Sequence, residues 1–214
     1  MARLVGSVCP LALALFLAAP GTAYAGAQVY QPLSASVRAT LNKSVADHSV
    51  PFLAFDTEAE ARLWLTAMSK RLASRIIDRL EREEFLVSVH YEAKRAGLDP
   101  QLVLGLIQVE SNFRKYAVSS AGARGFMQVM PFWIRLIGRH DDNLFNLRTN
   151  LRYGCVILRH YLDMENGDLY RALGRYNGSL GKAQYPTQVV RAWQRDWHYS
   201  THTAARNGDD DGRG

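Results

Sequence analysis

The chain has 214 residues, of which 48% are hydrophobic and 21% are charged. This length and apolar content suit one globular domain with a sizeable core, and they exclude a wholly disordered or a fibrous protein. Twenty-six lysines and arginines against 20 aspartates and glutamates give a formal net charge of +6. Such an excess is compatible with an anionic partner but does not identify one.

Residues 1–25 have the three parts of a secretory signal peptide. Arg3 gives a positively charged start, residues 11–19 form an apolar run, and Ala23 and Ala25 form a small-x-small cleavage site. We therefore expect an exported protein, periplasmic or secreted. After cleavage no apolar run is long enough to span a membrane as a helix.

The predicted cleavage removes one of the two cysteines and keeps the other. Cleavage removes Cys9 and leaves Cys155 as the single thiol, so that no internal disulfide can form. Because Cys155 falls on an apolar stripe with helical spacing, we expect a buried structural thiol rather than a nucleophile.

The chain after residue 25 has the patterns of helices. Residues 26–55, which contain Pro32 and Pro51, are expected to form an extended or loosely ordered lead-in. Thr57 and Glu60 then form a capping box, which predicts the start of a helix.

The most apolar helix is predicted over residues 102–110, with Asp99 as its N-cap and Pro100 as its first residue. A glycine- and serine-containing loop follows at 119–125, and further helices are predicted at 131–138, 146–164, 168–176 and 186–198. No strand alternation or sequence repeat is present, so the predicted fold class is all-α. We divide the exported chain into three parts. Residues 26–87 form an N-terminal extended and helical segment, and residues 88–199 form the main domain. Residues 200–214 are a polar tail that we expect to be disordered.

Glu110 stands at the end of this apolar helix, where Gln108 is the only other polar side chain after Leu102. Desolvation favours the neutral form of a carboxyl group, and so does the negative end of the helix dipole. A carboxyl group that stays protonated near neutral pH suits a general acid. An isolated glutamate can equally point to solvent at a helix end, so this residue alone leaves both interpretations open.

The segment 122–131 has features of a ligand-binding loop. Gly125 permits a tight turn and the close approach of a ligand, and Gln128 can both donate and accept hydrogen bonds. Met127 and Met130 offer apolar surface to the faces of sugars. Taken alone, the segment predicts only a turn followed by core residues.

Tyr176 shares a helical stripe with Leu169, Ala172 and Leu173, which predicts that its ring faces the interior. Core packing is enough to explain why the aromatic ring of Tyr176 faces the interior. A buried phenol also needs a hydrogen-bond partner, and a buried carboxyl group would supply one.

Three motifs together resemble the soluble lytic transglycosylases, the SLT domain of glycoside hydrolase family 23. In order, with Ser119 between the first two, they are Glu110-Ser111, Gly125-Phe126-Met127-Gln128 and Tyr176-Asn177-Gly178. The resemblance covers roughly residues 88–199. The chain departs from the usual family pattern at Phe126, where leucine is usual, and at Arg175, where alanine is usual.

The resemblance implies a lysozyme-like α-helical fold with a cleft for peptidoglycan glycan strands. It implies cleavage of the β-1,4 bond between N-acetylmuramic acid and N-acetylglucosamine, with formation of 1,6-anhydromuramic ends. Glu110 would be the general acid and then the base. The acetamido group of the substrate would shield the reaction centre, so no second catalytic carboxylate would be needed, in contrast to ordinary retaining glycosidases.

The resemblance also implies the roles of the other site residues. The residues expected to contact substrate are Ser119, Met127, Gln128, Met130 and Tyr176. Those expected to support the site are Ser111, Gly125 and Asn177. The Tyr176 hydroxyl would hydrogen-bond Glu110 and fix its orientation. We expect no cofactor and no metal, because the six histidines have no convincing ligand spacing.

Three other functions have to be weighed. A hydrolytic lysozyme on the same fold would need a second carboxylate, for which the candidates are Asp141, Asp142, Asp163, Glu165 and Asp168. A non-catalytic module of an envelope or secretion assembly would bind peptidoglycan without cleaving it. Nucleic-acid binding is disfavoured by the predicted export and the modest charge.

The sequence leaves four questions open. It does not say whether cleavage occurs at strand ends or internally, or whether the protein serves general wall turnover or a secretion system. It also leaves open the role of residues 26–87 and the oligomeric state.

Overall fold

The computed structural model describes residues 28–200 of the chain. The predicted signal peptide and nearly all of the predicted polar tail therefore lie outside the described residues. Between residues 28 and 200 the secondary structure consists of helices, with only isolated bridges between single residues in place of strands. The predicted all-α fold class is confirmed.

The helices have the following bounds in chain order: α1 (Ala35–Val45), α2 (Glu58–Leu72), α3 (Arg79–Arg95), α4 (Pro100–Ser111), α5 (Phe132–Ile137), α6 (Leu147–Met164), α7 (Leu169–Asn177), α8 (Gln184–Arg191) and a π-helical continuation of α8, η1 (Ala192–Trp197). The predicted helices at 131–138, 146–164 and 168–176 agree with α5, α6 and α7 to within one residue at each end. α8 begins two residues before the predicted start at 186.

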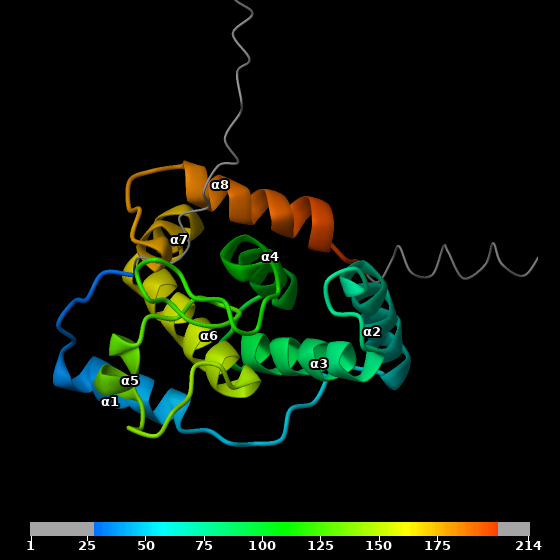
Figure 1. The fold of residues 1–214 in the computed structure, drawn as a ribbon, viewed down its shortest axis with the longest axis horizontal. Coiled ribbons are helices and arrows are strands. Elements are labelled where there is room, and N and C mark those ends of the chain that lie inside the picture. Colours follow the sequence, from blue (N-terminus) through cyan, green and yellow to red (C-terminus); the bar gives the residue numbers. More distant parts are fainter. Residues whose placement is uncertain (1–27, 201–214) are drawn as a thin grey trace, which may run out of the picture.

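α4 lies at the centre of the molecule, with α8 on one side of it and α3 on the other (Figure 1). It packs against α3, α8 and η1, while α6 packs against α1, α3 and α7. The buried apolar side chains of all these helices form one continuous core. α4 is therefore surrounded by protein, as its apolar sequence predicts.

The predicted N-terminal caps of α2 and α4 are present. The Thr57 hydroxyl accepts a hydrogen bond from the N–H of Glu60, and the Glu60 carboxylate accepts one from the N–H of Thr57, both at 3.2 Å. The Asp99 carboxylate accepts from the N–H of Gln101 at 2.7 Å, with Pro100 as the first helical residue. Each cap contributes about 1 kcal/mol to helix stability.

The prediction of an extended or loosely ordered lead-in over 26–55 is wrong for its central part, which forms α1. Ser34 caps this helix by accepting a hydrogen bond from the N–H of Val37 at 3.3 Å. Leu41 and Val45 are buried one turn apart, where α1 packs against α5 and α6. Two buried residues make a weak sequence pattern, and the helix owes its stability to this tertiary packing.

Cys155 is free and buried in the core, which confirms the prediction of a structural thiol. Among residues 28–200 no helix combines the length and the hydropathy that a membrane span requires.

A buried cluster of charges joins α1, α3 and α6. Glu92 on α3 is fully buried and lies 2.8 Å from a guanidinium nitrogen of Arg95 and 3.3 Å from one of Arg152 on α6. The same two arginines donate hydrogen bonds to the carbonyls of Ser44 and Val45, at 2.8 and 3.2 Å. These carbonyls end α1, so the cluster holds the end of that helix on the domain and satisfies its unpaired acceptors.

We predict that Arg152→Met lowers the free energy of unfolding by about 3 kcal/mol, because it leaves a buried carboxylate with one of its two cationic partners. Urea denaturation measures this loss. The matched control is Arg62→Met, which breaks the exposed pair between Arg62 and Glu58 and is expected to cost no more than about 0.5 kcal/mol. Equal losses in the two variants would contradict the prediction.

Candidate active site

The carboxyl group of Glu110 lies in the last turn of α4, at the end of an apolar helix. Five apolar side chains of this helix are almost completely buried: Leu102, Val103, Leu104, Leu106 and Ile107. The helix ends because Asn112 adopts a left-handed conformation, with φ of 48°, and its N–H donates to the Gln108 carbonyl at 3.1 Å.

The Glu110 side chain is removed from solvent, and only 4% of the residue is exposed. The Tyr185 hydroxyl of α8 donates a hydrogen bond to Oε1. Oε2 is buried and has no hydrogen-bond partner among the described residues. Burial raises the pKa of Glu110 from 4.5 to about 8, and the hydrogen bond from Tyr185 lowers it without offsetting the effect of burial. The carboxyl group is therefore protonated at neutral pH, and one of its oxygens has unused hydrogen-bonding capacity.

The predicted hydrogen bond between Tyr176 and Glu110 is wrong. Tyr176 is fully buried on α7, as its stripe predicts, but its hydroxyl donates to the Met127 carbonyl at 2.7 Å. The hydrogen-bond partner of the Glu110 carboxyl group is Tyr185 instead of Tyr176. The sequence offered one signal for Tyr185, because it lies one turn before the buried Val189 on α8. Pro186 favoured a later start for that helix and left Tyr185 outside it.

The loop between α4 and α5 is fixed on α6 through Gly125 and Asn150. Gly125 has φ of 75°, and a Cβ there would clash with the Asn150 amide and the Leu144 carbonyl. Asn150 accepts a hydrogen bond from the N–H of Met127 at 2.8 Å and donates to the Leu144 carbonyl at 2.9 Å. The loop therefore requires glycine at this position. The positioning residue Asn150, which belongs to a distant helix, was missed by the sequence analysis.

The Gln128 side chain is turned into this loop. Its Nε2 donates to the carbonyls of Ala117 and Gly125, at 3.1 and 2.9 Å, and the residue is 1% exposed with φ of 48°. Met127 is likewise fully buried, whereas Met130 is half-buried. In this arrangement the Gln128 amide shapes the backbone of the loop, and the predicted sugar contacts of these three residues stay predictions.

The remaining predicted residues also contribute to the loop and its supports. The Ser111 hydroxyl donates to the Phe126 carbonyl at 2.7 Å and so ties the end of α4 to the loop. The Ser119 hydroxyl accepts from the N–H of Ala123 at 3.1 Å within the loop. Asn177 is buried at the end of α7. The structure thus gathers most of the predicted residues around the loop between α4 and α5, and for Asn177 it shows only burial at the end of α7.

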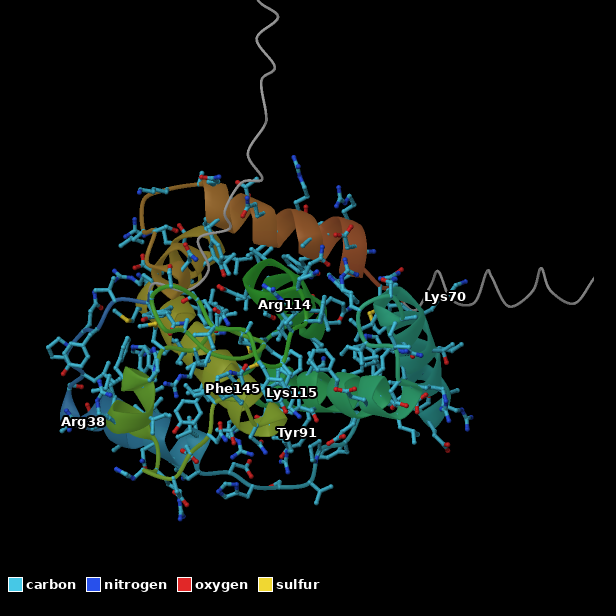
Figure 2. All side chains as sticks on the ribbon, viewed as in Figure 1. Arg38, Lys70, Tyr91, Arg114, Lys115 and Phe145 are labelled. Carbon is cyan, nitrogen blue, oxygen red and sulfur yellow. The ribbon has the colours of Figure 1, made fainter. Side chains whose placement is uncertain are left out.

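The outer surface of this loop is aromatic and cationic. Tyr116 is 71% exposed, and its ring centroid lies 5.9 Å from that of Phe145. The Lys115 ammonium lies 5.5 Å from the Tyr116 ring, and the Arg124 guanidinium lies 5.8 Å from the Phe145 ring. Figure 2 shows Lys115 and Phe145 near the middle of the face that it draws. Such a surface suits sugar faces and acidic substituents.

The carboxylates considered for a hydrolase all have structural partners. Asp141 and Asp163 pair with nearby arginines, Asp142 accepts from the Tyr153 hydroxyl, Glu165 pairs with Arg171 and Arg175, and Asp168 caps α7. No carboxylate contributes to the pKa shift of Glu110, which has burial and Tyr185 as its causes. Over residues 28–200, no group of three or more histidine, cysteine, aspartate or glutamate side chains is arranged to hold a metal ion.

Comparison with known proteins gives matches to several transglycosylases. The transglycosylase of Enterobacteria phage PRD1 is 36% identical over 102 residues, which is 44% of this chain and 37% of the phage protein. The membrane-bound lytic murein transglycosylase C of Glaesserella parasuis is 38% identical over 131 residues, 52% of this chain and 34% of that protein. The protein of the same name from Haemophilus influenzae is 31% identical over 164 residues, 69% of this chain and 38% of that protein. The chain therefore spans a little over a third of the length of these relatives.

The family model described as "Transglycosylase SLT domain" matches residues 88–195. This range is about half of the chain, and it includes Glu110, the loop between α4 and α5, and the helices that carry Tyr176 and Tyr185. The chain belongs to the transglycosylase SLT domain family.

Proposed function

We propose that the protein is an exported peptidoglycan lytic transglycosylase with Glu110 as its catalytic residue. The observation that carries this proposal is the buried, protonated carboxyl group at the end of α4, whose Oε2 has no hydrogen-bond partner among the described residues. Family membership supports the reaction class, and the names of the relatives support murein as the substrate. The predicted signal peptide and the envelope setting in those names support a periplasmic or secreted location.

The first chemical step needs an acid. Glu110 donates its proton to the glycosidic oxygen that joins N-acetylmuramic acid to N-acetylglucosamine, and the bond from C1 to this oxygen breaks. The positive charge that develops at C1 is shielded by the acetamido group of the same sugar. Burial keeps the proton on Glu110 until the substrate arrives, because the charged form is disfavoured without a partner.

The second step needs a base, and Glu110 is now ionised. It takes the proton from the C6 hydroxyl of the muramyl residue, and O6 bonds to C1 to close the 1,6-anhydro ring. The carboxyl group returns to its protonated state, and no water is consumed. The Tyr185 hydroxyl favours the ionised form between the two steps, because it donates a hydrogen bond to Oε1.

This mechanism differs from that of a hydrolytic lysozyme, which needs a second carboxylate to activate water or to form a covalent intermediate. The five candidate carboxylates are engaged in ion pairs, a helix cap and a bond to Tyr153. Their engagement supports the transglycosylase reaction over hydrolysis. The residues proposed for substrate contact remain Ser119, Met127, Gln128, Met130 and Tyr176, supported by Ser111, Gly125 and Asn177.

We predict that Glu110→Gln lowers the release of muropeptides from sacculi by at least about 100-fold, because the amide cannot donate the acidic proton. Mass spectrometry of the products of the unchanged protein is expected to show 1,6-anhydromuramic ends. The matched control, Glu58→Gln, alters an exposed carboxylate on α2 and is expected to keep full activity. Reducing muramic ends would indicate a hydrolase. Equal digestion by Glu110→Gln would remove Glu110 from the mechanism, and binding of sacculi without digestion by the unchanged protein would indicate a non-catalytic module.

A second prediction concerns the pH dependence of kcat/KM. Because the free enzyme needs a protonated acid, activity is expected to fall as pH rises through the pKa of Glu110, which is about 8. Tyr185→Phe removes the hydrogen bond that lowers this pKa, so the falling limb is expected to move to higher pH, while kcat falls by about tenfold because Glu110 loses its orientation.

The control for this prediction is Tyr176→Phe. Its hydroxyl bonds the Met127 carbonyl, so its removal is expected to leave the position of the limb unchanged, whatever it does to KM. If the falling limb of kcat/KM moved further in Tyr176→Phe than in Tyr185→Phe, Tyr176 would be the hydrogen-bond partner of Glu110, as the sequence predicted. That result would contradict the hydrogen bond between Tyr185 and Glu110.

A further inference from the structure

The start of the described chain lies beside the candidate active site. In Figure 1 the segment before α1 begins near α6 and α7 and then runs outward to α1. Gln28 is only 4% exposed, whereas Val29 and Tyr30 are 58% and 57% exposed. Tyr30 contacts the edge of the Phe132 ring, with 5.7 Å between ring centroids. We define residues 28–33 as the strap. Gln28 is its one buried residue, Leu33 at its other end is half-buried against the core, and residues 29–32 are exposed.

The carboxamide of Gln28 is surrounded by polar groups of the loop between α4 and α5 and of α5 itself. Its Oε1 accepts hydrogen bonds from the N–H of Met130 at 3.2 Å and from the Trp133 indole N–H at 3.0 Å. Its Nε2 donates to the carbonyl of Gln128 at 3.5 Å. The Gln28 side chain also lies close enough to Tyr176 to exert a lowering effect on the pKa of its hydroxyl. The groups around Gln28 thus present two donors to a carbonyl oxygen and an acceptor to an amide N–H.

This arrangement matches the chemistry of an acetamido group. The acetamido group of an N-acetylated sugar has the same carbonyl oxygen and amide N–H as the glutamine side chain. The groups around Gln28 also lie near Glu110. Tyr176 bonds the Met127 carbonyl of the same loop, and it is close enough to Glu110 for that carboxyl group to raise the pKa of the phenol. A glycan strand reaching Glu110 along this loop would bring an acetamido group to the place that Gln28 holds.

We propose that Gln28 occupies an acetamido-binding subsite and that the strap, residues 28–33, is a self-inhibitory segment that a glycan strand displaces. This inference rests on the proposed function for its physiological substrate. The strap can be displaced because residues 29–32 are exposed, which leaves Gln28 and the half-buried Leu33 as its contacts with the core. The incoming sugar then replaces the hydrogen bonds that Gln28 loses, so the polar groups around Gln28 are never left unpaired.

The test measures binding without turnover. Isothermal titration calorimetry of the N-acetylglucosamine trimer with the unchanged chain and with Gln28→Ala gives the two dissociation constants. We expect the variant to bind about tenfold more tightly, which corresponds to a strap that is closed in about nine-tenths of the molecules. Gln31→Ala is the matched control, because Gln31 lies on the same strap and is exposed, and its affinity is expected to equal that of the unchanged chain.

A second readout follows the Trp133 indole N–H by NMR. Gln28→Ala is expected to shift this resonance, because the indole loses its acceptor, and added trimer is expected to move it back toward its original position. Equal affinities of Gln28→Ala and the unchanged chain would overturn the proposal. Weaker binding by Gln28→Ala, with or without a lower melting temperature, would also overturn it, because Gln28 would then support the site rather than compete for it.

This binding test is separate from the proposed reaction. If the unchanged protein releases no anhydromuropeptides from sacculi, the proposed function fails. Tighter binding of the trimer by Gln28→Ala would still establish the strap as a competitor for the subsite.

Discussion

The buried carboxyl group of Glu110 is the constraint on which the rest of the site depends. Its pKa is about 8 in the folded protein, against 4.5 for an ordinary glutamate. Between these pH values the unfolded chain releases a proton that the folded chain keeps. The free energy of unfolding therefore falls as pH rises through this window, by up to about 1.4 kcal/mol per pH unit. Below pH 4.5 both states hold the proton, and this penalty is absent.

The packing of α8 and η1 on α4 places the partner of the Glu110 carboxyl group. A Cβ at Gly105 would lie 2.8 Å from the backbone nitrogen of Trp193, so the two helix backbones approach closely. The Trp197 indole donates to the Gln108 side chain at 2.8 Å and fixes the register of this contact. Since Tyr185 belongs to the same continuous helix, the contact also sets its hydroxyl against the carboxyl group. The pKa of the acid thus depends on helix packing more than one turn away from it.

The sequence allowed the helices and the burial of Glu110 to be predicted, because both depend on local patterns. Capping residues mark the starts of α2 and α4, and the apolar run before Glu110 implies its burial. The partner of Glu110 could not be predicted in the same way. A helical stripe tells which side of α7 or α8 faces inward, but both Tyr176 and Tyr185 face inward. Which hydroxyl reaches the carboxyl group depends on the docking of these helices on α4, and helix docking is not encoded in any single segment.

The same limit applies to the residues predicted to contact substrate. The amide of Gln128 and the hydroxyl of Ser119 are used inside the loop, where they bond backbone groups. Their effect is to fix the backbone, and Gln128, with φ of 48°, directs its own carbonyl and the Met130 N–H to the side where Gln28 binds. A motif of polar side chains can therefore specify a binding surface made of backbone groups. In the proposed subsite, substitution of such a residue changes sugar binding through the shape of the loop, even where its side chain never touches the sugar.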